Sequence, residues 1–216
     1  MMKRNRLTAV ALAAACANGA FAMDVAGFEF NGYSRGGPVF NHSDGVKGNL
    51  TLGGDLQKYR LGNEGDYGIE VNFARTFDAG GVKWKVNYMP AKWGSGDIGT
   101  EQAYVEMSGF AFSPEAKFWA GQRRLRIQDV HIVDHFLMNY GDNQGAGVTD
   151  IPVGGMKLGV GVFTGDKFDS NLPGNAKARR INADLSEINT NPGGKLRVLL
   201  TAVSGSGQVN GGSGSG

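Results

Sequence analysis

Apolar and polar residues alternate along most of the chain, in short segments separated by glycine-rich or polar turns. Within residues 66–73 the odd-numbered positions are apolar (Tyr67, Ile69, Val71 and Phe73), and the even-numbered positions are Asp, Gly, Glu and Asn. Residues 82–88, 158–162, 180–185 and 195–202 repeat this pattern. A period of two is typical of strands with one apolar face, whereas a helical period is almost absent. The pattern therefore predicts an all-β protein.

Two architectures fit such strands. A soluble β-sandwich turns the apolar face inward, whereas a membrane barrel turns it toward lipid and the polar face toward a lumen. The polar faces here carry charge, and several aromatic residues are predicted near strand ends, as an interfacial girdle requires: Phe28, Phe40, Tyr88, Phe110, Phe112 and Trp119. These features favour an antiparallel transmembrane β-barrel, and the sandwich remains the alternative.

The first 22 residues are typical of a secretory signal peptide. A basic start is followed by an apolar stretch and by Ala20-Phe21-Ala22, which predicts cleavage after Ala22. Cys16, the only cysteine, lies inside this segment and has an alternative reading as a lipid-attachment site. The predicted mature chain therefore has no disulfide, and its charge is balanced at 19 basic and 20 acidic side chains. No nucleic-acid partner is expected, and no apolar run is long enough for a membrane-spanning helix.

Residues 31–37, "NGYSRGG", place an aromatic ring and a guanidinium two residues apart in a predicted strand. Tyr33 and Arg35 therefore share one face. In a barrel with this alternation, that face is the lumen.

Five blocks of sequence, in order, resemble the maltoporin family of sugar-specific outer-membrane porins: "FNGYSRGG", "KYRLGNE" (58–64), "FWAGQRRLRIQDVHIVDHF" (118–136), "GAGVTDIPVGGMKLGVGV" (145–162) and "INTNPGGKLRV" (188–198). The resemblance implies a porin fold, an eighteen-stranded antiparallel barrel that assembles as a homotrimer in the outer membrane of a Gram-negative bacterium. It also implies passive sugar transport, with an oligosaccharide or disaccharide as substrate, lipid around the barrel, no cofactor and no metal.

The resemblance also implies the site residues. The aromatic slide along which sugars pass would include Tyr33, Trp93 and Phe136, with Trp93 in a loop and donated to a neighbouring subunit. The flanking polar track would include Arg35, Arg60, Glu70, Arg126, Asp129 and Asp134. Asp129, Asp134 and Phe136 match a loop that folds inward and narrows the pore. The alternative is that Tyr33 fills the lumen and Arg35 belongs to a charge network.

Some positions depart from the family pattern. The second slide ring is replaced by Gly68, and Tyr67 is one position off, so that it would face the wrong side unless a bulge shifts it. A track arginine is replaced by Glu101. These departures put specificity for maltodextrins in doubt and leave other oligosaccharides or disaccharides open.

The 194 residues after Ala22 suffice for roughly eight or nine membrane strands, about half of the family barrel. We expect the signal peptide in residues 1–22, the N-terminal part of the barrel in 23–203 and a flexible Gly/Ser-rich tail in 204–216. Three explanations of the length are open: a fragment of a longer porin, a smaller closed barrel, or a protein that has become a secreted sugar-binding one.

The predicted function is a sugar-selective outer-membrane channel that mediates facilitated diffusion. The alternative is a secreted or periplasmic β-sandwich carbohydrate-binding protein, and a general porin is the nearest rival within the channel class. An enzyme is not expected: Asp129 and Asp134 are the only obvious carboxylate pair for glycoside hydrolysis, and in the family they belong to the channel. His131 lies near both aspartates, but one histidine and two carboxylates at this spacing are a weak metal signal.

Overall fold

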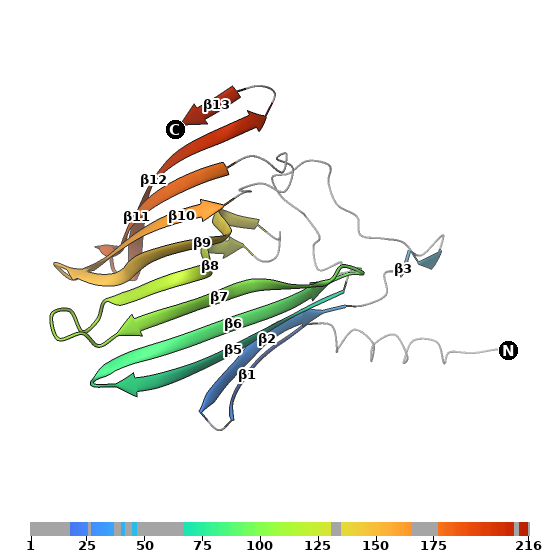
Figure 1. The fold of residues 1–216 in the computed structure, drawn as a ribbon, viewed down its shortest axis with the longest axis horizontal. Coiled ribbons are helices and arrows are strands. Elements are labelled where there is room, and N and C mark those ends of the chain that lie inside the picture. The colour runs from blue at the N-terminus through green and yellow to red at the C-terminus, as the bar shows by residue number, and fades with distance from the viewer. Residues whose placement is uncertain are drawn as a thin grey trace. The chain divides into compact units, whose positions relative to one another are not determined.

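The computed structural model describes residues 18–25, 27–36, 40–41, 45–46, 67–130, 135–165, 177–209 and 212–215. Within these ranges, side chains are described for residues 27–36, 67–124, 144–164 and 179–204. Every regular element in the described ranges is a β-strand (Figure 1). No helix in this part of the chain is long and apolar enough to cross a bilayer. The predicted all-β class is therefore confirmed.

The strands are β1 (Asn18–Val25), β2 (Phe28–Arg35), β3 (Phe40–Asn41), β4 (Gly45–Val46), β5 (Gly68–Ala79), β6 (Val82–Trp93), β7 (Ile98–Ser108), β8 (Lys117–Val130), β9 (His135–Val153), β10 (Met156–Gly165), β11 (Lys177–Asn191), β12 (Gly194–Val209) and β13 (Gly212–Ser215). Eleven of them follow the hydrogen-bonded order β1-β2-β5-β6-β7-β8-β9-β10-β11-β12-β13, and β3 pairs with β4. Because strands that are neighbours in this sheet also follow one another along the chain, with only β3 and β4 between β2 and β5, the topology is an up-and-down meander. Tight turns at Gly80-Gly81, Gly154-Gly155 and Pro192-Gly193 join consecutive strands, and the five glycines all have positive φ.

Contacts divide the chain into two compact units, which are described separately. Unit 1 comprises residues 1–74, 88–100 and 126–139, and unit 2 comprises residues 75–87, 101–125 and 140–216. Unit 1 therefore includes β1, β2, the start of β5 and the end of β6, whereas unit 2 includes most of β7 to β13.

In both units the apolar face of the strands is exposed and the polar face is covered. In unit 1, Ile69 is 45% exposed, whereas the adjacent Glu70 is only 8% exposed. In unit 2, Val162 is 46% exposed and Ile181, directly opposite on β11, is also exposed, whereas the polar Asn182 is buried. A soluble sandwich buries its apolar face, so this arrangement contradicts the sandwich alternative. It is the sidedness of a strand that meets lipid on one face.

Aromatic rings lie on the covered face of unit 2, where three glycines make room for them. Trp119 on β8 and Phe163 on β10 have ring centroids 5.2 Å apart, and both side chains are buried. A Cβ at Gly145, Gly147 or Gly161 would lie 2.9–3.4 Å from one or both rings. The prediction of Trp119 in an interfacial girdle is therefore wrong, because the ring lies on the glycine side of β9 and β10 and is only 2% exposed. Phe28, Tyr88 and Phe112, from the same predicted group, are exposed.

The structure also differs from expectation at both predicted ends of the barrel. Residues 204–209 continue β12 and residues 212–215 form β13, although this segment was predicted to be a flexible tail. Ser204 pairs with Ser215 and Gly205 with Gly214, because a strand ladder is built from backbone groups and requires no large side chain. At the other end, β1 includes residues 18–22 of the predicted signal peptide. Residues 1–17 lie outside the described residues, so cleavage after Ala22 stays a prediction.

Candidate functional site

The candidate site in unit 1 is formed where the end of β6 approaches the start of β5 and the end of β2. Trp93 is the last residue of β6, whereas the sequence predicted it in a loop. The turn that follows is fixed by Gly94, which has φ +53°, and the N–H of Gly94 donates to the carbonyl oxygen of Tyr67 at 2.9 Å. The N–H of Gly96 donates to the carbonyl oxygen of Trp93 at 3.1 Å. The first bond holds the backbone that follows Trp93 beside Tyr67, the residue before β5, and the second closes the turn.

Three side chains of unit 1 meet at this point. The guanidinium carbon of Arg35 lies 4.8 Å from the centroid of the Trp93 ring, within the range of a cation–π contact. The ring of Tyr33 lies 6.4 Å from the same indole, inclined by 35°. The prediction that Tyr33 and Arg35 share a face is therefore confirmed. We call Tyr33, Arg35, Gly68 and Trp93 together the Trp93 platform.

The indole of Trp93 lies directly on Gly68. A Cβ at residue 68 would be 2.0 Å from Cε3 and 2.2 Å from Cζ3 of the indole, so the indole would have to move to make room for a side chain. The indole therefore occupies the space above this glycine within its own chain, whereas the resemblance implied donation to a neighbouring subunit.

Burial alternates without interruption from Gly68 to Ala74, which fixes the face of each residue. Gly68 and Glu70 lie on the covered face, two residues apart, and Glu70 therefore projects on the side of the Trp93 platform. Tyr67 is exposed together with Ile69. The prediction that Tyr67 faces away from the polar side is thus confirmed, and Tyr67 does not substitute for the missing ring.

The remaining predicted site residues cannot be placed at the level of side chains. Arg60 and Asp134 lie outside the described residues, as does His131. Arg126 and Asp129 lie in β8, and Phe136 lies in β9, where only the backbone is described. Asp129 and Phe136 therefore belong to strands and not to the predicted inward-folding loop. Their roles in sugar binding stay predictions.

The sequence analysis missed a second aromatic–charged cluster, in unit 2. The guanidinium carbon of Arg123 lies 4.8 Å from the ring centroid of Tyr104 and 5.3 Å from that of Trp119. Nη1 of Arg123 is 3.2 Å from a carboxylate oxygen of Glu106, which lies opposite Trp119 in the β7–β8 ladder. The alternation of Tyr104 and Glu106 in "EQAYVE" could have indicated this shared face. Because Arg123 contacts two rings and a carboxylate on the covered face, this cluster ties β7 to β8 there.

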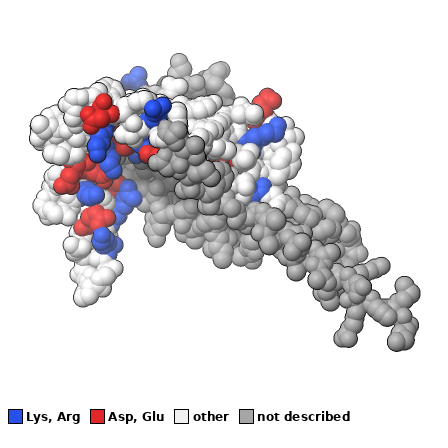
Figure 2. All heavy atoms as spheres, turned by 90° about the horizontal axis from the view of Figure 1, so that it is seen from below, with Lys and Arg blue, Asp and Glu red and all other residues white. Residues whose placement is uncertain are grey.

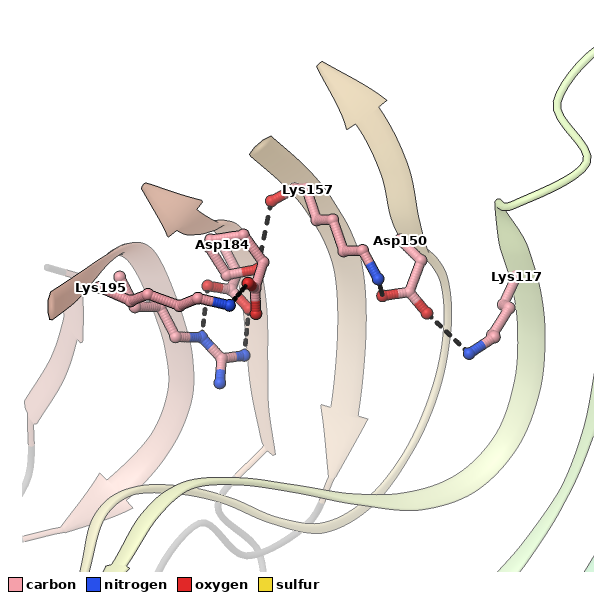
Figure 3. A network of polar contacts seen from close by, with 8 residues as sticks. Lys117, Asp150, Lys157, Asp184 and Lys195 are labelled. Carbon is pink, nitrogen blue, oxygen red and sulfur yellow. Dashed lines mark hydrogen bonds and ion pairs between the residues drawn. The ribbon is translucent and has the colours of Figure 1, made fainter. Parts of the chain in front are cut away.

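Further ion pairs lie on β8 to β12 of unit 2 (Figure 3). Asp150 lies between two lysines: its Oδ2 is 2.8 Å from Nζ of Lys117, and its Oδ1 is 3.8 Å from Nζ of Lys157. Asp184 accepts two hydrogen bonds from Arg197, one of them from Nε at 2.7 Å. The space-filling view likewise shows basic and acidic side chains intermixed on one face of the molecule (Figure 2). Such a surface contacts neutral polar solutes through donors and acceptors without selecting one sign of charge.

Two acidic residues of unit 2, Asp150 and Glu187, lie at irregularities in the strands. Asp150 has φ 58° and Glu187 has φ 61°, and the strand register shifts beside each of them. An extra residue in one strand re-aims the side chains next to it, which is the usual effect of a β-bulge. Here the carboxylate of Asp150 reaches Lys117, and that of Glu187 reaches Lys195 on β12.

Glu101, which stands where the family pattern has an arginine, forms an ion pair with Arg124 of β8. The backbone N–H of Arg124 also donates to Oε1 of Gln102 at 3.2 Å. Both charged side chains are mostly buried, with Arg124 only 9% exposed. The described residues contain no cluster of three His, Cys, Asp or Glu side chains suited to a metal ion.

Comparison with known proteins agrees with this geometry. A family model described as LamB porin matches residues 28–216. The chain is 36% identical over 182 residues to maltoporins of Vibrio cholerae serotype O1, from both the El Tor Inaba and the Classical Ogawa strains. The match covers 78% of this chain but 41% of each maltoporin, so the chain spans less than half the length of these relatives. By the extent of the match, the chain belongs to the LamB porin family.

Proposed function

We propose that this chain is part of a sugar-selective channel of the Gram-negative outer membrane, through which oligosaccharides or disaccharides pass by facilitated diffusion. Membership of a porin family and similarity to maltoporins support a channel rather than an enzyme. The exposed apolar face and the covered polar face support strands that separate lipid from an aqueous interior. A homotrimer, as the resemblance implies, is part of the proposal.

The observation that carries sugar selectivity is the Trp93 platform. Two aromatic rings with centroids 6.4 Å apart present apolar surface to the C–H face of a sugar, and Arg35 supplies donors for hydroxyl groups beside them. Glu70, on the same face of β5, supplies acceptors. Passage requires contacts that are favourable enough for entry and weak enough for release. Stacking on rings with hydrogen bonds at the side meets that requirement.

The test is ion conductance through planar bilayers that contain the refolded chain, with maltotriose or sucrose added stepwise. We expect sugar to block the current, and we expect Tyr33→Ala to weaken the block by about fivefold to tenfold through the loss of one stacking surface. Tyr67→Ala is the matched control, because Tyr67 lies on the opposite, exposed face of the same region. Current that no sugar blocks, or equal effects of the two substitutions, would contradict the proposal.

A further inference from the structure

Arg75 is a charged residue on the exposed, apolar face of β5. Burial alternates along this strand, and Arg75 falls on the face of Ile69 and Phe77, both of which are exposed. A charge on a lipid-facing strand is costly at the bilayer midplane, and the cost becomes small only near the interfaces. Arg75 lies four residues before Ala79, the last residue of β5, where the Gly80-Gly81 turn leads into β6 (Figure 1). Its charge can therefore reach the interface at this end of the strand.

The side chain of Arg75 runs toward that turn. Its guanidinium carbon lies 5.1 Å from the ring centroid of Phe77, which is two residues nearer the turn on the same face. This is the direction in which a long basic side chain on a lipid-facing strand carries its charge out of the hydrocarbon and toward the headgroups. A guanidinium can stack on a ring and bind a phosphate through its N–H edge, so the contact with Phe77 is compatible with phosphate binding.

Aromatic rings mark the same end of unit 2 as the level of the headgroups. Phe77 and Trp84 are exposed, and each lies two residues from the end of its strand that meets the turn. A Cβ at Gly109 would lie 3.0 Å from the carbonyl oxygen of Gly81, so the chain that follows β7 passes beside this turn. Three rings with centroids 5.1–6.0 Å apart come next: Phe110, Phe112 and Phe118. Aromatic residues form such girdles where a barrel crosses the membrane interface.

We propose that Arg75, with Phe77 and Trp84, forms a binding site for the phosphate group of an anionic phospholipid, in the leaflet at the Gly80-Gly81 end of β5 and β6. The N–H edge of the guanidinium donates to the phosphate oxygens, and the two rings contact the acyl chains. Inorganic phosphate has the same oxygens but lacks the acyl chains that suit an exposed apolar face, which favours the lipid. The site lies within unit 2 and goes beyond the proposed function, since it does not depend on sugar selectivity.

The test measures which lipid lies next to Trp84. The chain is refolded into phosphatidylcholine vesicles that contain a minor fraction of phosphatidylglycerol, and matched amounts of bromine are carried on the acyl chains of one lipid or the other. Quenching of Trp84, obtained by comparison with Trp84→Phe, gives the preference of the adjacent site for phosphatidylglycerol over phosphatidylcholine. We expect a preference of about fivefold, the usual contribution of one basic side chain near an anionic headgroup.

Three variants separate this site from general electrostatics. Arg75→Gln is expected to abolish the preference, whereas Arg75→Lys, which keeps the charge but not the planar fork of donors, is expected to retain a preference of about twofold to threefold. Lys85→Gln is the matched control, because it removes the same charge from β6 but lies between Trp84 and Val86 and so points to the other face. If Lys85→Gln abolishes the preference as Arg75→Gln does, the preference reflects overall charge and the inference is overturned.

The other outcomes are equally distinct. Excess inorganic phosphate at constant ionic strength is expected to leave the preference unchanged, and displacement of phosphatidylglycerol would show a site for free phosphate instead of a lipid. Equal quenching by the two brominated lipids in the unmodified chain would overturn the inference and leave the proposed sugar channel untouched. Absence of quenching by either lipid would show that this face does not contact lipid, and the inference would fail with that claim.

Discussion

Val162 offers a quantitative test of which face of the sheet meets lipid. It lies on the exposed apolar face of β10, directly opposite Ile181 of β11 and Ala146 of β9. We consider the substitution Val162→Arg, which places a permanent charge in the middle of this face. The same change is costly in lipid and nearly neutral in water, so its effect on the free energy of unfolding identifies the solvent that the face contacts.

The magnitude follows from the position of Val162 in the strand. An arginine on the lipid face costs about 2–4 kcal/mol at the bilayer midplane and about 0–1 kcal/mol near the interfaces. A substitution at an exposed position in water usually changes stability by about 0.5 kcal/mol or less. In lipid, therefore, Val162→Arg is expected to lower the ratio of folded to unfolded chain by about 30-fold to 900-fold. Thr164→Arg is the control, because Thr164 is exposed on the same face but lies one residue from the end of β10.

The assay is urea unfolding of the chain refolded into phosphatidylcholine vesicles, followed by tryptophan emission. We expect a clearly lower free energy of unfolding for Val162→Arg and a change of about 1 kcal/mol or less for Thr164→Arg. Equal free energies of unfolding for Val162→Arg and the unmodified chain would refute the reasoning, because a charge in the middle of a lipid-facing strand cannot be neutral.

Three further predictions concern the covered face and the bulges. Phe163→Ala should lower the free energy of unfolding by about 3–5 kcal/mol, because the ring is fully buried. A thermal or urea unfolding curve measures this, and a loss below about 1 kcal/mol would contradict the packing of Phe163 on the covered face. Glu187→Gly should leave the free energy of unfolding unchanged or raise it by up to about 1 kcal/mol, because glycine adopts the positive φ without strain and the exposed ion pair with Lys195 contributes little. A clear loss of stability in the same assay would be inconsistent with this. Glu101→Gln should lower the free energy of unfolding by about 1–3 kcal/mol, because the mostly buried Arg124 loses its carboxylate. The double variant Glu101→Gln with Arg124→Met should lower it by less. A larger loss in the double variant would contradict this and show that the ion pair itself is stabilising.

The period of two in residues 66–73 was sufficient to predict both a strand and its faces. Ile69 and Glu70 lie on opposite faces, as the alternation indicated, and Tyr67 lies on the same face as Ile69. Successive residues of a strand point to opposite faces, so which residues share a face can be predicted from consecutive residues alone. The same reasoning correctly placed Tyr33 and Arg35 on one face.

Contacts between distant residues could not be predicted in this way. Trp93 precedes a Gly-Ser-Gly run, which suggested a loop, whereas the ring is seated on Gly68, 25 positions earlier in the chain. Trp119 stands near a strand end, but its position along the strand does not reveal which face it occupies; only the glycines of β9 and β10 opposite its ring show that the covered face has room for it. Such contacts depend on the register between strands, which a single sequence does not specify.

The most direct test of lipid contact is quenching of tryptophan emission by brominated phosphatidylcholine. Trp84 is 41% exposed on the apolar face of β6, whereas Trp119 is buried on the covered face. The chain refolded into brominated vesicles should show strong quenching, and Trp84→Phe should remove most of it while Trp119→Phe should not. Quenching that persists undiminished in Trp84→Phe would contradict the central claim that the exposed apolar face of these strands lies in lipid.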